Sequence, residues 1–277
     1  EALADALAEI VRRHESLRTL FQERGGRPTY EIQQAPFQLQ QLELEEEALD
    51  EWIRSCSLQT FDLARQLPIR AWLARLKGQS HVLVVVMHHI VSDGWSMGVF
   101  TRELEVLYRA FSQAQPSPLP ALSLQYADFA SWQRGWMSGE VLHKQMNYWR
   151  EQLRGIPPLL RLPYDRPRPP VQSFRGGVYH QAFSPQCSQR LQAFCSAHGV
   201  TLFMVLQAAF AVLVSRYSGQ QDLAIGSPVA NRNRREVEEL IGFFVNTLVI
   251  RTDLSGSPSF LDLLEQTRRR ALEAFAH

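Results

Sequence analysis

The chain has 277 residues, of which 45% are hydrophobic and 21% are charged, and its formal net charge is +1. This composition is typical of a folded globular protein and excludes an intrinsically disordered chain. The near-neutral charge excludes the basic surplus on which nucleic-acid binding depends.

The cysteines and the chain ends indicate the compartment. Cys56, Cys187 and Cys195 stand at no metal or redox spacing, which favours a reducing compartment, and we expect the cytoplasm. The chain opens without a basic start followed by an apolar run, so no secretory signal is predicted. The most apolar stretch, 200–214, is interrupted by Gln207 and is shorter than the ~20 residues that span a bilayer, so we predict a buried helix and no membrane segment. Both ends stop inside helical patterns, which predicts a domain truncated at both ends.

The first half of the chain predicts mixed helices and strands. A helix is expected at 3–22, followed by strand-like residues at 29–44 and a second helix at 47–58. A turn at 77–79 then joins two strands into a hairpin, and a long helix follows at 95–111.

The second half begins with prolines. Three between 116 and 120 precede another helical region, and six between 157 and 170 give the strongest linker signal in the sequence. We therefore predict an N-terminal lobe at 1–160, an inter-lobe linker at 161–176 and a C-terminal lobe at 177–277. In that last lobe we expect helices at 185–198, 201–217 and 259–277 and strands at 177–183, 222–227 and 243–252. The whole pattern predicts an α/β fold of two-layer α+β type.

The most informative segment is 81–96, which reads HVLVVVMHHIVSDGWS. Because successive side chains on a strand point to opposite faces, His88 and His89 cannot share one cavity while the strand continues. We interpret His88 as structural and His89 as functional, because a polar loop opens the face on which His89 lies. Asp93 either caps the following helix or forms an ion pair, and both readings stay open. No His, Cys, Asp or Glu set with zinc-ligand spacing surrounds the pair, so no metal site is predicted.

A competing motif overlaps this segment. Residues 94–98 read GWSMG and match the GxSxG nucleophile elbow of serine hydrolases, with Ser96 as nucleophile. An elbow needs the strand to run directly into the serine turn, whereas six residues, 88–93, intervene here. Asp222 and His198, the later triad candidates, have no motif support. A hydrolase is therefore the more remote alternative.

Four motifs in order resemble those of condensation domains of nonribosomal peptide synthetases, which are relatives of chloramphenicol acetyltransferase. Residues 87–96 resemble the family's HHxxxDG signature, and 13–21, RHESLRTLF, resemble its RHExLRT motif. Residues 126–133, YADFASWQ, resemble YxDFAxW, and 241–247, IGFFVNT, resemble IGxFVNT. The family's opening SxxQxRL motif and its late HQD motif are absent, which agrees with truncation at both ends.

This resemblance implies two chloramphenicol acetyltransferase-like lobes in a V, the second one incomplete. It implies peptide-bond formation, in which the amine of a carrier-bound aminoacyl thioester attacks an upstream carrier-bound acyl or peptidyl thioester, with L-configured donor and acceptor. The implied partners are an upstream and a downstream peptidyl carrier domain and an adjacent adenylation domain. No cofactor is held by the domain itself, because both substrates ride on phosphopantetheine arms of the carriers.

The resemblance also assigns residues. His89 is the expected catalytic residue, as a general base or by positioning the amine, and the backbone N–H of Gly94 is expected to face the oxyanion. Arg18 is the predicted ion-pair partner of Asp93. A final group is expected to line the site and comprises Trp95, Ser96 and Asn246.

Three other readings concern relatives of the same family, of which the epimerisation domain shares the histidine motif. An epimerisation domain, the main alternative, would remove an α-proton from one carrier-bound substrate. A non-catalytic member would recruit other enzymes, although intact His89, Asp93 and Gly94 argue against it. Heterocyclisation is disfavoured, because those members replace the histidine pair with aspartates.

Overall fold

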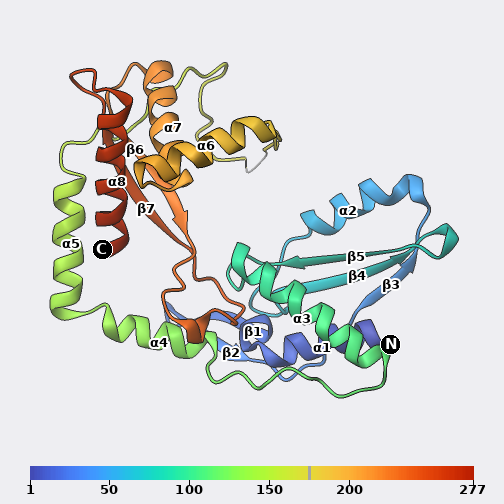
Figure 1. Cartoon of the computed structure of the whole chain (residues 1–277). Coiled ribbons are helices and arrows are strands. Elements are labelled where there is room, and N and C mark those ends of the chain that lie inside the picture. The colour runs from blue at the N-terminus through green and yellow to red at the C-terminus, as the bar shows by residue number, and fades with distance from the viewer. Residues whose placement is uncertain (174–175) are drawn as a thin grey trace. The chain divides into compact units, whose positions relative to one another are not determined.

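The computed structural model describes residues 1–173 and 176–277, which pack into two units (Figure 1). The first unit comprises 1–137 and 230–246, and the second comprises 138–229 and 247–277. This division does not coincide with the boundary predicted at 161–176, which falls inside the second unit; two residues of that stretch, 174 and 175, lie outside the described residues. Prolines restrict the backbone locally, but they carry no information about which distant segment, here 230–246, returns to the first unit.

The centre of the first unit is a three-stranded sheet between helices. Its strand order is β3-β4-β5. The β3–β4 pair is parallel and the β4–β5 pair is antiparallel, with Ile69 opposite Met87 and Arg75 opposite His81. One face carries two packed helices and the other face carries a third (Figure 1). The elements are α1 (Ala2–Arg13), α2 (Leu49–Leu58), α3 (Gly94–Ser112), β3 (Gln40–Glu43), β4 (Ile69–Arg75) and β5 (His81–Met87).

The alternation predicted for β5 is present. Leu83, Val85 and Met87 pack against the core that α1 and α3 build. Val82, Val84 and Val86 pack on the opposite face, against residues of α2. A strand between two helical layers therefore delivers the histidines, and the predicted hairpin turn is confirmed by Gly78, whose φ is 79°.

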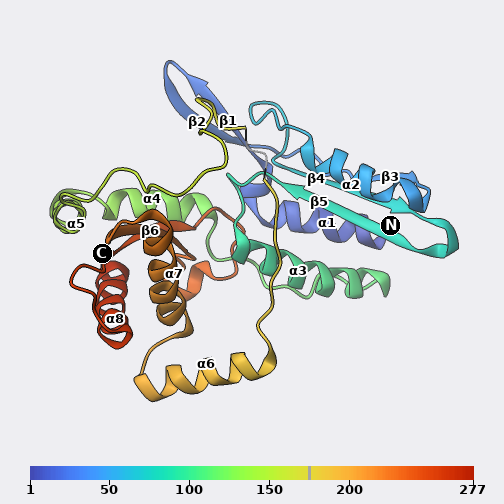
Figure 2. The same cartoon turned by 90° about the horizontal axis from the view of Figure 1, so that it is seen from above.

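The helix predicted at 3–22 is wrong in its second half. Helix α1 ends at Arg13, because His14 is extended (φ −103°, ψ 103°). A short 3-10 helix, Glu15–Arg18, follows, and then strand β1 (Thr19–Arg24) pairs antiparallel with β2 (Arg27–Ile32), a hairpin that extends away from α1 (Figure 2). Leu17 and Phe21 stand at positions that fit a helical period, and they also pack into the core of the real structure. Periodicity alone therefore did not reveal the break.

A second, smaller core completes the first unit. Helix α4 (Tyr126–Trp136) contributes Phe129, and the returning segment 230–246 contributes Val237, Leu240 and Phe244. This core packs a segment from late in the sequence against α4, and Ile241 of the same segment lies in the core that α1 and α3 build.

The second unit contains four helices and a two-stranded sheet in its described part. The strand predicted at 177–183 is wrong: these residues form no regular element, and Val178 and Tyr179 are 82% and 86% exposed. A strand needs a neighbour to pair with and a surface to pack on, and in the described part of the chain residues 177–183 have neither. The elements are α5 (Gly139–Gln152), α6 (Pro185–His198), α7 (Leu202–Ser218), α8 (Phe260–Ala276), β6 (Asp222–Val229) and β7 (Asn246–Asp253).

The apolar helix predicted at 201–217 is α7, and it is buried on one face only. Ala208 and Ala211 are fully buried, whereas Phe210 and Leu213 are 50% and 51% exposed. No single helix in the described residues has both the length and the apolar character to cross a membrane; α6 and α7 satisfy that test only when taken together, with a bend of 104° between them.

Candidate active site

The candidate site begins where β5 ends. Beyond Met87 the chain turns through 88–92 and enters α3 at Gly94. His88, which is partly buried, accepts at Nδ1 from the N–H of Ile90 at 3.1 Å. Its ring lies perpendicular to that of Phe61, with 5.8 Å between centroids. His88 therefore contacts the turn and the side chain of a neighbouring loop.

His89 is exposed and its ring is fixed on one edge. Nδ1 lies 2.6 Å from the carbonyl oxygen of Ser92. Because a carbonyl oxygen only accepts hydrogen bonds, Nδ1 carries the proton, and in the neutral ring Nε2 is then the acceptor. The ring also stands perpendicular to Phe243 at 5.1 Å. This arrangement can accept a proton at Nε2.

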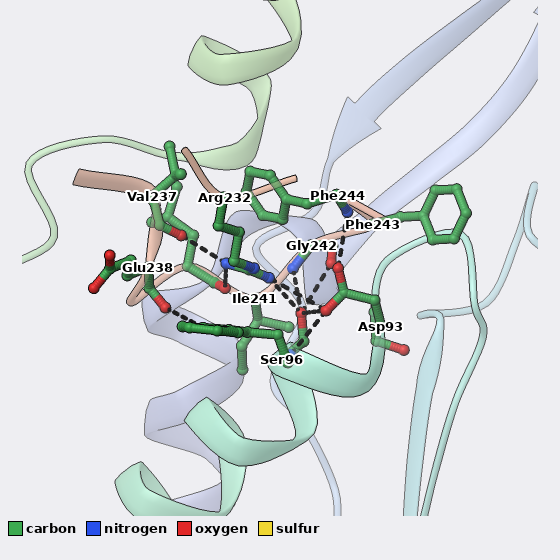
Figure 3. Close-up of polar contacts among 12 residues, drawn as sticks. Asp93, Ser96, Arg232, Val237, Glu238, Ile241, Gly242, Phe243 and Phe244 are labelled. Carbon is green, nitrogen blue, oxygen red and sulfur yellow. Dashed lines mark hydrogen bonds and ion pairs between the residues drawn. The ribbon is translucent and has the colours of Figure 1, made fainter. Parts of the chain in front are cut away.

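Asp93 has both of the roles that the sequence left open (Figure 3). As N-cap of α3, its Oδ1 accepts from the backbone N–H and the Oγ of Ser96, each at 2.8 Å. Oδ2 accepts from the N–H of Phe244 at 3.0 Å, and Nη2 of Arg232 lies 3.3 Å from Oδ1. A single buried carboxylate thus connects α3 with the segment 230–246.

The predicted partner of Asp93 is wrong. Arg18 instead lies 3.4 Å from Glu15 and donates to the carbonyl oxygens of Arg12 and Gln33. The actual partner, Arg232, stands in NRNRRE, a run that reads as a solvated turn. No sequence pattern indicated this partner. The pair has a physical reason, since a buried carboxylate requires a buried cation, and Arg232 lies in the segment whose Ile241 packs against α3.

The electrostatics of this pair keep the carboxylate charged. Burial on its own would raise the pKa of Asp93, but the hydrogen bonds from Ser96 and Phe244 and the charge of Arg232 outweigh burial and hold that pKa below its usual value. Burial lowers the pKa of Arg232, while the Asp93 carboxylate opposes that shift. Burial, together with the Asp93 charge, raises the pKa of Tyr126, so its phenol stays protonated.

The main chain of residues 241–244 is held at each residue. Ile241 donates its N–H to His14 Nδ1 at 3.3 Å, and its carbonyl accepts from Ser16 Oγ at 2.6 Å. Ser96 Oγ lies 3.1 Å from the N and 2.8 Å from the O of Gly242. Tyr126 Oη donates to the carbonyl of Phe243 at 2.7 Å, and the N–H of Phe244 is bound by Asp93.

We call residues 241–244 the clamped loop. It brings the four sequence motifs together, because each of its partners, His14, Ser16, Asp93, Ser96 and Tyr126, belongs to one of the other three. The sequence predicted no site role for Tyr126, His14 or Ser16. A buried histidine between an Arg and a Glu was the available signal; His14 is 1% exposed and pairs with Glu103 at 2.8 Å.

The remaining predicted residues have different positions. Gly94 and Trp95 are exposed at the first turn of α3, and the Trp95 indole donates to the carbonyl of Glu238 at 2.8 Å. Ser96 is fully buried, so it supports the site from within, and its hydroxyl is inaccessible as a hydrolase nucleophile. Asn246 is exposed at the start of β7. Among the described residues, no group of three or more His, Cys, Asp or Glu side chains is placed to hold a metal ion.

Comparisons with known proteins agree with the motifs. The family model for the condensation domain matches residues 1–277. The chain is 49% identical to a component of linear gramicidin synthase from Brevibacillus parabrevis, with 98% of this chain and 6% of that protein covered. It is 46% identical to chondramide synthase of Chondromyces crocatus, with 100% and 7% covered.

Solved structures give the same result. The teicoplanin X-domain, solved in complex with OxyB, is 34% identical with a TM-score of 0.92, and 100% of this chain and 62% of that chain are covered. The epimerization domain from the third module of tyrocidine synthetase B is 20% identical with a TM-score of 0.83, with 98% and 63% covered, and it shares the fold alone. The chain thus spans less than a tenth of these synthases and under two thirds of these solved chains. The match over all 277 residues shows that this chain belongs to the condensation domain family of nonribosomal peptide synthetases.

Proposed function

We propose that this protein forms peptide bonds in nonribosomal peptide synthesis. The amine of an aminoacyl thioester on a downstream carrier attacks an acyl or peptidyl thioester on an upstream carrier, with L-configured donor and acceptor. The observation that carries the proposal is the state of His89, whose Nδ1–H is bound to Ser92 and whose Nε2 is therefore the acceptor at an exposed position.

The reaction needs one proton transfer. The neutral amine attacks the thioester carbonyl, a C–N bond forms, and the nitrogen passes a proton to Nε2 of His89. The C–S bond then breaks, and the leaving thiolate of the upstream phosphopantetheine takes that proton. An α-amino group has a pKa of about 7.7 to 8.0, so a useful fraction of the amine is neutral near pH 7 and little base strength is required.

Two contributions to the rate can be separated by magnitude. Proton transfer by a positioned histidine is typically worth 10²–10⁴-fold. Well-placed reactants reach effective molarities of about 10⁵ M and above, so holding two thioester arms end to end contributes as much or more. His89 serves both contributions, since the same nitrogen that accepts the proton orients the amine by a hydrogen bond.

The first turn of α3 provides positive partial charge for the oxyanion of the reaction. The N–H groups of Gly94 and Trp95 stand at the positive end of a 19-residue helix, and neither has an acceptor in the described part of the chain. A Cβ at Gly94 would meet nothing within 4 Å, so an oxygen can approach this backbone closely. We assign these N–H groups to the oxyanion that forms as the amine attacks.

The partners follow from the proposed reaction. The upstream and downstream carrier domains present the two substrates on phosphopantetheine arms, and an adjacent adenylation domain of the same synthetase supplies the activated amino acid. The domain itself holds no cofactor in this proposal. Support comes from the similarity to gramicidin and chondramide synthases, of which this chain matches a small part.

A second candidate is a domain that recruits another enzyme. It is favoured by one observation, the similarity to an X-domain solved in complex with OxyB. The fixed tautomer of His89 argues for catalysis, because a recruiting domain has no use for an exposed proton acceptor.

The test uses the natural synthetase polypeptide with loaded donor and acceptor carriers, and follows dipeptidyl-carrier formation by intact-protein mass spectrometry. We expect product from the wild type, a fall of 10²-fold or more in His89→Ala, and no change in His143→Ala, an exposed histidine on α5. Racemised acceptor without dipeptide would indicate epimerisation instead, and neither product would favour recruitment.

A further inference from the structure

The aromatic contact to His89 comes from the clamped loop. Phe243 is 40% exposed, whereas its neighbours Gly242 and Phe244 are buried. Its ring stands at 89° to the His89 ring with 5.1 Å between centroids, an arrangement that aromatic pairs prefer. A half-exposed phenylalanine within a buried loop contributes little to the core, so its place beside the histidine calls for another explanation.

Two contacts together restrict the imidazole. The Ser92 carbonyl holds the Nδ1 edge at 2.6 Å, which fixes the tautomer but leaves the ring free to tilt about that hydrogen bond. Phe243 packs against the ring and removes that tilt. Nε2 is then aimed in one direction, as a base or an orienting acceptor requires.

The position of Phe243 is itself fixed by the clamped loop. Its own carbonyl is bound by Tyr126, and the residues on either side are bound by Ser96 and Asp93. A Cβ on Gly242 would come within 2.2 Å of the Tyr126 ring, so the loop and that tyrosine are in tight contact. The backbone carrying Phe243 therefore has little freedom to shift.

We infer that Phe243 is a positioning residue for His89, and that the hydrogen bonds of His14, Ser16, Ser96 and Tyr126 to the clamped loop hold it in place. This inference rests on the proposed function, since it concerns the geometry of the same histidine. It assigns the purpose of the contact to orientation, and no contact between Phe243 and the reacting atoms is implied.

The first experiment is Phe243→Leu in the natural synthetase polypeptide, assayed for dipeptidyl-carrier formation. Leucine keeps an apolar side chain but lacks the flat ring, so we expect kcat to fall about 5- to 20-fold while KM for the aminoacyl carrier stays within about twofold. Phe243→Tyr keeps the ring and should restore more than half of the wild-type kcat. The matched control is Tyr108→Leu, which removes a ring that is 50% exposed on α3, and it should behave as wild type.

A second readout does not depend on activity. Diethyl pyrocarbonate acylates an accessible neutral imidazole nitrogen, and fragment-ion mass spectrometry separates His88 from His89. We expect the rate at His89 to rise at least threefold in Phe243→Leu and to stay unchanged in Phe243→Tyr and Tyr108→Leu.

The two readouts distinguish the possible failures. A wild type that forms no dipeptide would overturn the proposed function, while an altered His89 reactivity in Phe243→Leu would still uphold the positioning. Unchanged kcat together with unchanged reactivity at His89, in a Phe243→Leu variant that melts like wild type, would overturn the inference. A loss of kcat that Phe243→Tyr fails to restore would do the same.

Discussion

In the described residues, each unit contains one aspartate–arginine pair that joins segments distant in sequence, and the two pairs differ in burial. Asp93 and Arg232 in the first unit are 4% and 1% exposed in their side chains. Asp222 and Arg251 in the second unit are 32% and 24% exposed. The buried pair is surrounded by further bonds to Ser96 and Phe244, whereas the half-exposed pair contacts solvent. By hydrogen-bond geometry alone, the second pair would be the stronger. Arg251 donates to both oxygens of Asp222, at 2.8 and 2.7 Å, whereas Arg232 lies 3.3 Å from one oxygen of Asp93.

Burial reverses that ranking. Removing one partner of a buried pair leaves an uncompensated charge in a medium that cannot solvate it, whereas water replaces the lost partner of an exposed pair. The comparison indicates that the first unit depends on its ion pair to hold the segment 230–246, and with it the clamped loop, against α3. The second unit uses its pair as a minor tie between β6 and β7.

The largest expected effect comes from Asp93→Asn. The shape is kept, but Arg232 stays buried without a counter-charge, so the free energy of unfolding should fall by about 3–5 kcal/mol. Dipeptide formation should fall with it, because the clamped loop loses the bond at Phe244. Urea unfolding followed by tryptophan fluorescence measures the loss. A change below about 1 kcal/mol would mean that the buried pair is no more important than an exposed one.

A smaller effect is expected for Gly242→Ala. The new methyl group would lie 2.2 Å from Cδ2 of Tyr126, and overpacking of this kind costs about 1–3 kcal/mol. Gly135→Ala is the control, because nothing lies within 4 Å of its Cβ position on α4. Combining Gly242→Ala with Tyr126→Leu, which shortens the obstructing side chain, should give less than the sum of the single losses. Full additivity in the double-mutant cycle would show that the tyrosine is not what Gly242 accommodates.

The same comparison predicts a dependence on acid. Burial would raise the pKa values of Asp93 and Glu103, but the partners of each carboxylate, including Arg232 for the first and His14 and Arg13 for the second, lower both values overall. A carboxylate whose folded pKa is depressed stabilises the fold above its unfolded pKa, about 3.9 for Asp and 4.3 for Glu. That contribution is lost as the pH falls through the folded pKa.

The measurement is urea unfolding between pH 3 and 7. We expect the first unit to lose stability steeply below about pH 4, and Glu103→Gln to flatten that slope. Glu105→Gln on the exposed side of α3 is the control, because its carboxylate is 69% exposed. Equal slopes in both variants would exclude Glu103 as a source of the acid sensitivity.

The sequence predicted the local parts of this arrangement and missed the long-range ones. Alternating valines and a Gly-containing turn define the β4–β5 hairpin, and Asp93 before an amphipathic run defines the start of α3, because each pattern is complete within about ten residues. His89 followed from its place beyond a buried strand.

Several partners of Asp93 and of the clamped loop are distant in sequence. Arg232 lies 139 residues from Asp93, and Ile241 lies 227 residues from its partner His14. No periodicity encodes such pairings. The motif match assigned Arg18 to Asp93 because Arg18 belongs to the motif at 13–21, but its side chain pairs with Glu15 instead. The false strand at 177–183 has the same origin, since strand propensity does not supply a neighbouring strand.

The smallest expected effect completes the comparison. Arg251 donates to both oxygens of Asp222 and also to the carbonyls of Gln152 and Arg154, so three acceptors remain in Asp222→Asn. We expect a loss below about 1 kcal/mol, and we expect about 1 M NaCl to remove most of it, because salt screens exposed charges. The loss in Asp93→Asn should persist in the same salt, since ions do not reach a side chain that is 4% exposed. Salt therefore separates the two pairs more sharply than either substitution alone, and a salt-sensitive Asp93→Asn would mean that water enters the buried pair.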